Sequence, residues 1–325
     1  MIYNAYCVLF AVLPWSIDLD LGVGQLLFPA EPLMAVLGPA LLFSLRVDHI
    51  RQAWDRTKWL PCLAFAYMAW MMLSVVWSTM PQVSAKYCLV EATHALVFGV
   101  GFWLYPALWR PCLRWMGISV TFLTVYVLGH HSIYSFRPDQ ALLAPMPFFP
   151  EHNMWACLLV MLLFLWFYAW QSVEPKWKIL YKWLPLIWIL AIALTASRGA
   201  WLSAWLALGI LGLTGVTRGK KMLFGVVWFS GMAVGIWLFS TRSGYVSELE
   251  RLNRWHCAWQ MTAERPVTGF GPGTFQFQYL PFQQPEDMTR ISLKTPLTER
   301  NPDNYGKGGG AHAEWARVLA ENGWP

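Results

Sequence analysis

The stretch TASRGAWLSAW, Thr195 to Trp205, holds one charged residue between two long uncharged runs. Residues 183–197 before Arg198 carry no charge, and neither do residues 199–217 after it. Runs of this kind are typical of helices that cross a membrane. We therefore expect one span to end and the next to begin at Arg198, at a membrane surface.

The composition of the chain extends this interpretation to its whole length. Hydrophobic residues make up 57% and charged residues 13%, whereas soluble domains are about 25% charged. The sequence therefore predicts an all-α polytopic membrane protein. The net charge of +6 gives no reason to expect nucleic-acid binding, because basic residues of membrane proteins concentrate in cytoplasmic loops. The six cysteines form no CxxC pair and favour neither a disulfide framework nor a zinc site.

Hydropathy predicts nine spans, and the basic residues orient them. The spans are at about 3–15, 29–45, 59–78, 87–109, 115–131, 153–171, 183–197, 199–216 and 222–240. Short loops on one side hold twelve basic residues, namely Arg46, Arg51, Arg56, Lys58, Arg110, Arg114, Lys176, Lys178, Lys182, Arg218, Lys220 and Lys221. Those on the other side hold three, namely Lys86, Arg137 and Arg198. This asymmetry predicts that the N-terminus lies inside, on the cytoplasmic side of the membrane.

The predicted topology divides the chain into a transmembrane bundle, residues 1–240, and a segment outside the membrane, residues 241–325. The segment is polar, is rich in Gly and Pro, and is too long for a plain connector. We expect it to be a functional cap that contains helices. Because the sequence ends at ENGWP without a closing element, we also expect it to be a fragment that lacks further spans.

Arg198 stands where an anion could bind. The span that begins here offers free backbone N–H groups and the positive end of a helix dipole. Ser197 and Thr195 can cap that helix, and Gly199 lets the backbone approach a ligand. The planar guanidinium suits a phosphate. The alternative is an arginine that pairs with lipid headgroups.

Two stretches of the cap have helical spacing. RLNRWHCAWQMTAERP, Arg251 to Pro266, predicts a helix that ends at Pro266 and brings Arg251 and Arg254 toward one site; an amphipathic helix on the membrane surface is the alternative. GGGAHAEWARVLAENG, Gly308 to Gly323, predicts a helix that ends at Gly323. We expect His312 in its first turn, where the dipole favours a neutral imidazole that can act as a base. A surface histidine is the alternative.

Other groups complete the candidate site. The stretch TGFGPG, 268–273, predicts a tight turn, because it lacks the flanking features of a phosphate loop. Glu314, Arg317 and Glu321 have helical spacing and are expected to pair. Glu91 and His94 share one face of the fourth span. No ligand spacing predicts a metal site.

Together these motifs resemble the O-antigen ligase-related family, which includes O-antigen ligases, O-antigen polymerases and some bacterial O-oligosaccharyltransferases. The resemblance covers residues 195–325. Ala313 departs from it, because the family often has a small polar residue there. The tracts that carry it are TxSRG at 195–199, RxxxWxxAWxM…ERPxTGxGPGxF at 251–275 and AHxEWxxVLAExG at 311–323.

The resemblance implies a twelve-span glycosyltransferase of the bacterial inner membrane, with residues 241–325 as a periplasmic loop. Such an enzyme would be metal-independent and cofactor-free and would invert the anomeric centre. Its donor would be a glycan on undecaprenyl diphosphate, and its acceptor lipid A–core, another glycan or a protein. Arg198, Arg251 and Arg254 would bind the diphosphate and His312 would be the general base. We expect supporting roles for Ser197, Glu91, His94 and Glu314.

Ligation of O-antigen is the function we expect, and three others stay open. A polymerase or a protein O-oligosaccharyltransferase would use the same donor with a different acceptor. A transporter of small anions is a further alternative, although no matched pair of interrupted spans supports it.

Overall fold

The computed structural model describes residues 2–20, 25–150, 152–170, 173–215, 220–240, 246–283 and 310–324. Arg218 and the glycines at 308 and 309 lie outside these residues. The chain packs as two compact units. Unit 1 comprises Met1–Leu45 and Val100–Thr241, and unit 2 comprises Arg46–Gly99 and Arg242–Pro325.

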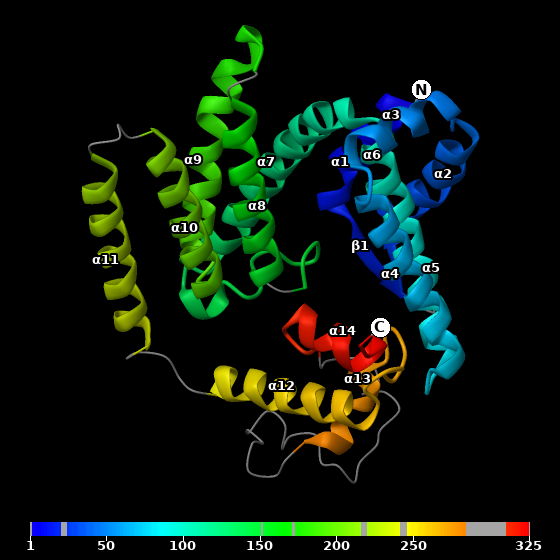
Figure 1. Cartoon of the computed structure of the whole chain (residues 1–325). Helices are drawn as coiled ribbons and strands as arrows, with labels where there is room; N and C mark the ends of the chain where they lie inside the picture. The colour runs from blue at the N-terminus through cyan, green and yellow to red at the C-terminus, as the bar shows by residue number, and fades with distance from the viewer. Residues whose placement is uncertain are drawn as a thin grey trace. The chain divides into compact units, whose positions relative to one another are not determined.

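Unit 1 is a bundle of apolar helices (Figure 1). Its members are α1 (Ile2–Val12), α2 (Ala30–Phe43), α6 (Gly101–Leu104), α7 (Trp109–Ile133), α8 (His152–Trp170), α9 (Lys178–Leu194), α10 (Arg198–Gly215) and α11 (Lys221–Ser240). A short antiparallel hairpin, β1 (Ile17–Asp20) with β2 (Gln25–Phe28), joins α1 to α2 and pairs Ile17 with Phe28. This hairpin is an exception to the predicted all-α fold; helices dominate the rest of the described chain.

Tryptophans form the centre of unit 1. Trp155, Trp166 and Trp188 are fully buried between α7, α8 and α9. The ring of Trp166 stacks on Tyr181 with centroids 3.9 Å apart, and Trp188 donates its indole N–H to Thr121 Oγ1 at 3.0 Å. A buried indole N–H needs an acceptor, and here a neighbouring helix supplies it. These contacts fix the positions of the helices that lead to Arg198.

Most of the predicted spans correspond to apolar helices of the described chain. Five helices are long and apolar enough to cross a membrane, namely Leu60–Trp77, Pro81–Leu104, Pro106–Ile133, His152–Trp170 and Pro175–Leu194. Ile2–Trp15, Arg198–Leu213 and Lys221–Gly235 are shorter apolar helices. The span predicted at 29–45 is α2, which bends by 101° into α3 (Val47–Thr57), where we expected a loop. The chain is thus a helical polytopic membrane protein, and the count of nine spans stays a prediction.

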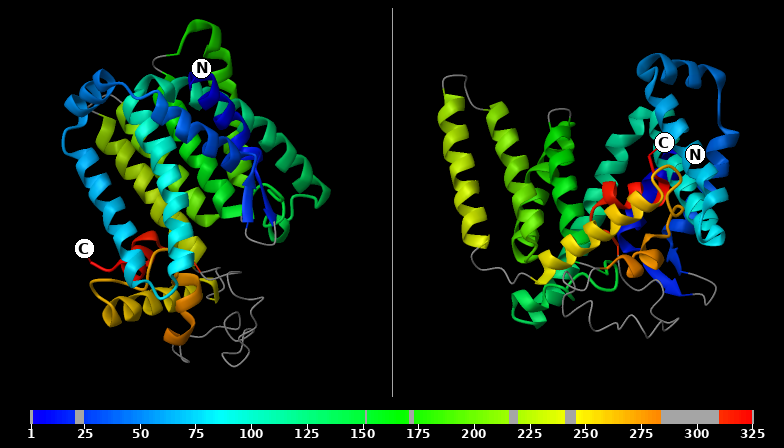
Figure 2. Two further views of the ribbon diagram at one scale, coloured as in Figure 1. Left: turned by 90° about the vertical axis from the view of Figure 1, so that its right-hand side faces the viewer. Right: turned by 60° about the horizontal axis from the view of Figure 1, so that its bottom comes forward.

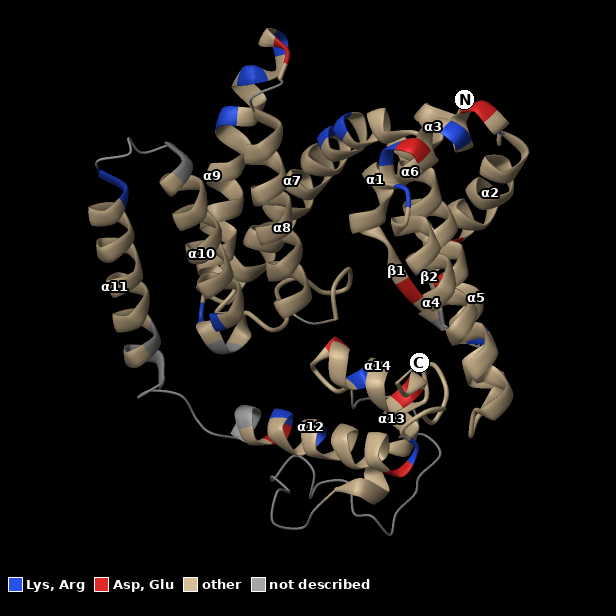
Figure 3. Ribbon diagram, in the orientation of Figure 1, with Lys and Arg blue, Asp and Glu red and all other residues tan. Residues whose placement is uncertain are grey.

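The basic residues of unit 1 are distributed unequally between the ends of its helices. Figure 3 shows them gathered where α7, α9 and α11 begin, and fewer where α9 meets α10. The first group belongs to the loops that we predict to be cytoplasmic, and the α9–α10 junction holds Arg198. The distribution agrees with the predicted orientation, which stays a prediction.

Unit 2 joins one helical hairpin to the segment after α11. The hairpin consists of α4 (Leu60–Ser74), η2 (Val75–Trp77) and α5 (Pro81–His94), and a π-helical turn, Ala95–Val100, comes directly after α5. The later segment contributes α12 (Val246–Glu264), α13 (Phe275–Gln278), η8 (Leu280–Phe282) and α14 (Glu314–Asn322). Within unit 2, α12 runs across the axes of α4 and α5 rather than along them (Figures 1 and 2). A division of the chain at residue 241 stays a prediction, while the packing groups residues 46–99 with residues 242–325.

Hydrogen bonds between distant residues hold this segment on the α4–α5 hairpin. Thr79 donates its backbone N–H to Phe270 O at 2.9 Å, and Ser84 Oγ donates to Pro272 O at 2.8 Å. Trp70 Nε1 donates to Asn322 O at 2.9 Å. The segment therefore packs on the end of the hairpin at which α4 meets α5. This arrangement agrees with the predicted topology, which stays a prediction.

The predicted turn at 268–273 is confirmed, and its glycines explain the close contact. Gly269 and Gly271 have φ of 62° and 111°, values that favour glycine. A Cβ at Gly269 would lie 2.2 Å from Glu321 O, and one at Gly271 would lie 2.1 Å from Ser78 Oγ. The turn fits between α14 and the α4–α5 turn because these positions lack side chains.

We predict that Gly271→Ala loosens this contact. The added methyl meets Ser78 and must adopt a positive φ, which together cost about 3 kcal/mol. Amide hydrogen exchange at Thr79, whose N–H is bonded to Phe270, should become faster. Gly129→Ala is the matched control, because a Cβ at Gly129 meets no atom within 4 Å. Unchanged protection of Thr79 in Gly271→Ala would contradict this account.

Candidate functional site

Arg254 and His312 meet in unit 2. The guanidinium Nη1 of Arg254 and the imidazole Nε2 of His312 are 2.9 Å apart, although the residues are 58 positions apart in the chain. Helix α12 carries Arg254, and His312 directly precedes Ala313, the residue at the N-cap position of α14. The structure thus brings together two of the residues that the sequence predicted for the site.

The expected place of His312 in the first turn of a helix is wrong. Helix α14 begins at Glu314, and His312 lies before it with φ of 52°. The side chain is exposed. The direct contact with Arg254, rather than the dipole of α14, is therefore the interaction that affects the His312 imidazole. The end of the helix at Gly323 is confirmed, with φ of 67°.

Three further contacts surround the Arg254 guanidinium. Its Nε donates to Glu250 Oε1 at 3.3 Å, and its Nη1 also donates to Gly310 O at 3.0 Å. The ring centroid of Tyr279 lies 5.8 Å from its Cζ. Its Nη2 makes no hydrogen bond to any residue that the structure describes. Only 12% of the Arg254 side chain and 8% of the Glu250 side chain are exposed, so this pair is largely shielded from solvent.

Sequence reasoning missed Glu250, Gly310 and Tyr279. The spacing of Glu250, four residues before Arg254, is the usual one for an ion pair on a helix and could have been found. Burial raises the pKa of the Tyr279 phenol, and the Arg254 guanidinium opposes that effect. Tyr279 therefore keeps its proton near neutral pH, which leaves His312 as the candidate base in this group.

Arg251 differs from Arg254 in its contacts. It is exposed on α12, one helical turn earlier, and makes no hydrogen bond or ion pair with any residue that the structure describes. Its guanidinium is therefore available to an anion from outside. The helix predicted at 251–266 is confirmed as part of α12, Val246–Glu264.

Arg198 belongs to unit 1 and is the first residue of α10. It is exposed, while Ser197 and Thr195 beside it are buried. Ser197 is the predicted N-cap residue of α10: Ala200 donates its backbone N–H to Ser197 Oγ at 3.4 Å. The same hydroxyl donates to Asn153 Oδ1 at 2.8 Å. The positive end of a helix favours an anion, and Arg198 adds a cation at that end of α10. A Cβ at Gly199 would meet open space, so packing does not require the glycine.

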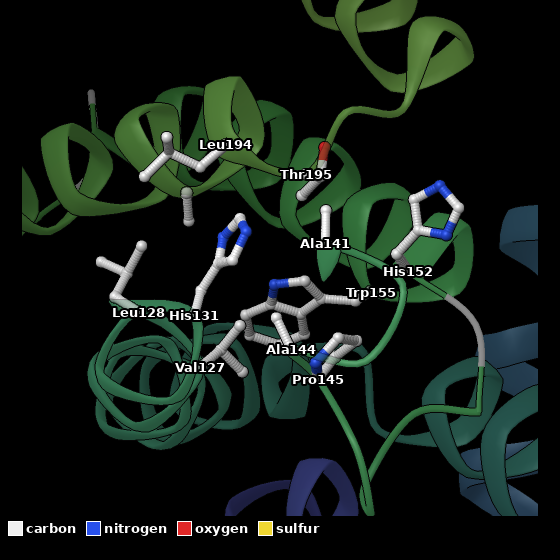
Figure 4. A pocket seen from close by; sticks show the side chains of 11 residues that line it. Val127, Leu128, His131, Ala141, Ala144, Pro145, His152, Trp155, Leu194 and Thr195 are labelled. Atoms are coloured by element: carbon white, nitrogen blue, oxygen red, sulfur yellow. The ribbon is translucent and has the colours of Figure 1, made fainter. Parts of the chain in front are cut away.

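A small pocket lies beside the start of α10 in unit 1. His131, His152, Trp155 and Thr195 line it together with apolar side chains (Figure 4). The Nε2 of His131 lies 3.0 Å from Arg137 O, and the side chain is buried. The backbone contact gives His131 a structural role. Of the residues predicted at the anion site, Thr195 lines the pocket, whereas Arg198 and Ser197 do not.

The ion pairs predicted for α14 are confirmed, and they stabilise the packing of residues 241–325, the cap. Arg317 donates from Nε to Glu314 Oε2 and from Nη1 to Glu321 Oε2, both at 3.1 Å, and from Nη1 to Tyr87 OH on α5 at 2.8 Å. Glu321 Oε1 accepts the Phe275 N–H at 3.0 Å. Burial raises the pKa of the Glu321 carboxyl, and Arg317 opposes that effect. Glu314 therefore forms an ion pair with Arg317, which lies one helical turn later on α14.

Glu91 and His94 lie on α5 in unit 2. Both are partly buried, and the His94 ring stacks on Phe98 with centroids 6.0 Å apart. A π-helical turn begins directly after His94. The structure gives neither residue a hydrogen bond to Arg254 or His312, so their supporting role stays a prediction.

Comparison with known families agrees with the sequence motifs. Residues 180–325 match the family model described as O-antigen ligase. This match supports the resemblance to the O-antigen ligase-related family over the part of the chain that runs from within α9 to α14. No curated protein and no solved structure matches the chain.

We predict that Glu321→Ala destabilises the cap far more than Glu314→Ala. The first change leaves the Phe275 N–H without its acceptor and removes a buried charge from Arg317, at a cost of about 3 kcal/mol. The second removes an exposed carboxylate and costs about 1 kcal/mol or less. Alkylation of Cys257, fully buried in the cap, measures the opening. Equal alkylation rates in the two variants would show that the Glu321 contacts do not hold the cap.

Proposed function

We infer that the protein is an inner-membrane glycosyltransferase that moves a glycan from undecaprenyl diphosphate to an acceptor hydroxyl, with ligation of O-antigen to lipid A–core as its reaction. The observation that carries this proposal is the contact of Arg254 with His312 inside the segment that matches the O-antigen ligase family. In this contact a guanidinium, which suits a phosphate, lies beside an imidazole, the side chain that most often serves as a general base.

The proposed reaction is a direct displacement. The acceptor O–H bond breaks, and its proton passes to Nε2 of His312. The acceptor oxygen forms the new glycosidic bond, while the bond from the anomeric carbon to the diphosphate breaks. The electron pair of that bond leaves with the diphosphate oxygen. Attack from the face opposite the leaving group inverts the anomeric centre.

Arginines take the part that a metal plays in other phosphate chemistry. The leaving diphosphate gains negative charge as the bond breaks, and fixed cations stabilise that charge without reorganising. Arg251 and Arg254 on α12 and Arg198 at the start of α10 are the cations assigned to this task. A histidine base with a pKa near neutral contributes about 10²- to 10⁴-fold in rate.

The proposed location rests on the charges and the turn contacts. With twelve basic residues in the loops of one side, the N-terminus is assigned to the cytoplasm and residues 241–325 to the periplasm. The contact of Phe270 with Thr79 supports this assignment, because the two lie on the same side of the α4–α5 hairpin. A lipid-linked donor would reach the cap at that surface, since its polyprenol tail stays in the membrane.

The test is complementation of a strain from which the gene is deleted. Surface lipopolysaccharide, separated by size on a gel, should lose its glycan-bearing bands while lipid-linked glycan accumulates. Wild type should restore the bands; Arg198→Ala and His312→Ala should not. Lys176→Ala is the control, because Lys176 is an exposed residue paired with Glu174 and its loss should have no effect.

Other gel patterns identify other acceptors. A band with a single repeat in place of the ladder would indicate a polymerase. An unchanged ladder in the deletion strain would contradict ligation and direct the search to protein glycosylation or to transport. Full complementation by His312→Ala would remove His312 from the role of base.

A further inference from the structure

The contact between Arg254 and His312 has a consequence for proton transfer. A guanidinium carries only N–H donors and stays protonated in proteins. The short contact from Nη1 therefore makes Nε2 of His312 the acceptor. A neutral imidazole with its lone pair at Nε2 carries its proton at Nδ1. In this arrangement the ring has no second lone pair that could take the proton of an acceptor.

We propose that Arg254 covers His312, by which we mean that its guanidinium occupies the Nε2 lone pair, until a donor diphosphate binds that guanidinium and moves it from the imidazole. His312 can then act as a base only when a donor is bound. This inference rests on the proposed function of the site. It makes Arg254 the residue that couples the two substrates, and it predicts that the donor binds before the acceptor reacts.

The surroundings of Arg254 suit such a transfer. Its Nε is held by the buried carboxylate of Glu250, while its Nη2 has no hydrogen-bond partner among the described residues. Glu250 thus acts as a pivot, and Nη2 is the first group that a phosphate oxygen can engage. A bidentate guanidinium–phosphate contact is stronger than a bond to a neutral nitrogen. Rotation about the Glu250 contact would then release Nε2.

Coupling of this kind limits a side reaction. A donor diphosphate is an activated leaving group, and an uncovered base would activate water as readily as an acceptor hydroxyl. Glu250 is a positioning residue in this scheme, because it acts on His312 only through Arg254. The Gly310 carbonyl accepts a hydrogen bond from the same Nη1 nitrogen of Arg254. It therefore helps to keep the guanidinium on His312 when no donor is bound.

The experiment measures whether Nε2 of His312 is covered. Diethyl pyrocarbonate acylates an imidazole nitrogen that holds an available lone pair, and peptide mapping separates His312 from the other six histidines. The full chain in detergent is treated with and without geranyl diphosphate, with geraniol as the control that lacks the phosphates. His256, which is exposed on the same helix as Arg254, is the internal reference.

In wild type, geranyl diphosphate should speed the acylation of His312 by about 10-fold, the effect of losing one charge-assisted hydrogen bond, while His256 stays unchanged. In Arg254→Met the reaction should be fast with or without the ligand. Arg265→Met, in which the removed guanidinium lies over Phe270 instead, should behave as wild type. Glu250→Gln, which weakens the pivot, should raise the basal rate, and Glu264→Gln on the same helix should not.

Slower or unchanged acylation of His312 in the presence of geranyl diphosphate would overturn the coupling. So would a slow reaction in a folded Arg254→Met protein. Either result leaves the role of His312 as base to the complementation test, so the two proposals can fail separately.

Discussion

The fit of a glycine turn against the end of a helical hairpin is the constraint on which unit 2 depends. The carbonyl groups of Phe270 and Pro272 accept hydrogen bonds from Thr79 and Ser84. The turn lies so close to the hairpin that Gly271 has no room for a Cβ. The same turn bonds to the end of α14 through the Gly271 N–H and Glu321 O, at 2.8 Å. Because α14 is fixed there, His312 at its other end is held beside α12.

The sequence allowed much of this arrangement to be predicted, because the relevant signals are local. Uncharged runs predicted the apolar helices, Gly323 predicted the end of α14, and the spacing of Glu314, Arg317 and Glu321 predicted their ion pairs. The glycines of 268–273 predicted a turn. Each of these inferences uses residues that are near one another in the chain, where periodicity and backbone preference are decisive.

Contacts between distant residues could not be predicted in the same way. No local pattern joins Ser84 to Pro272 or Arg254 to His312, which are 188 and 58 positions apart. The place of His312 was wrong for a related reason: Ala313 is extended and starts the helix later than the pattern indicated. The β1–β2 hairpin was missed because two strands of four residues carry little periodic signal.

The most direct test of this account is a disulfide between the hairpin and the cap. Thr79→Cys and Phe270→Cys would be combined in a background whose six native cysteines are replaced by alanine. The Thr79 N–H donates to Phe270 O at 2.9 Å, so the two backbones are in direct contact, and a disulfide bridges Cα atoms that are about 4.4 to 6.8 Å apart. Mild oxidation should link them intramolecularly in the membrane. Failure to form the link, while each single cysteine reacts with a thiol reagent, would contradict the docking on which the site depends.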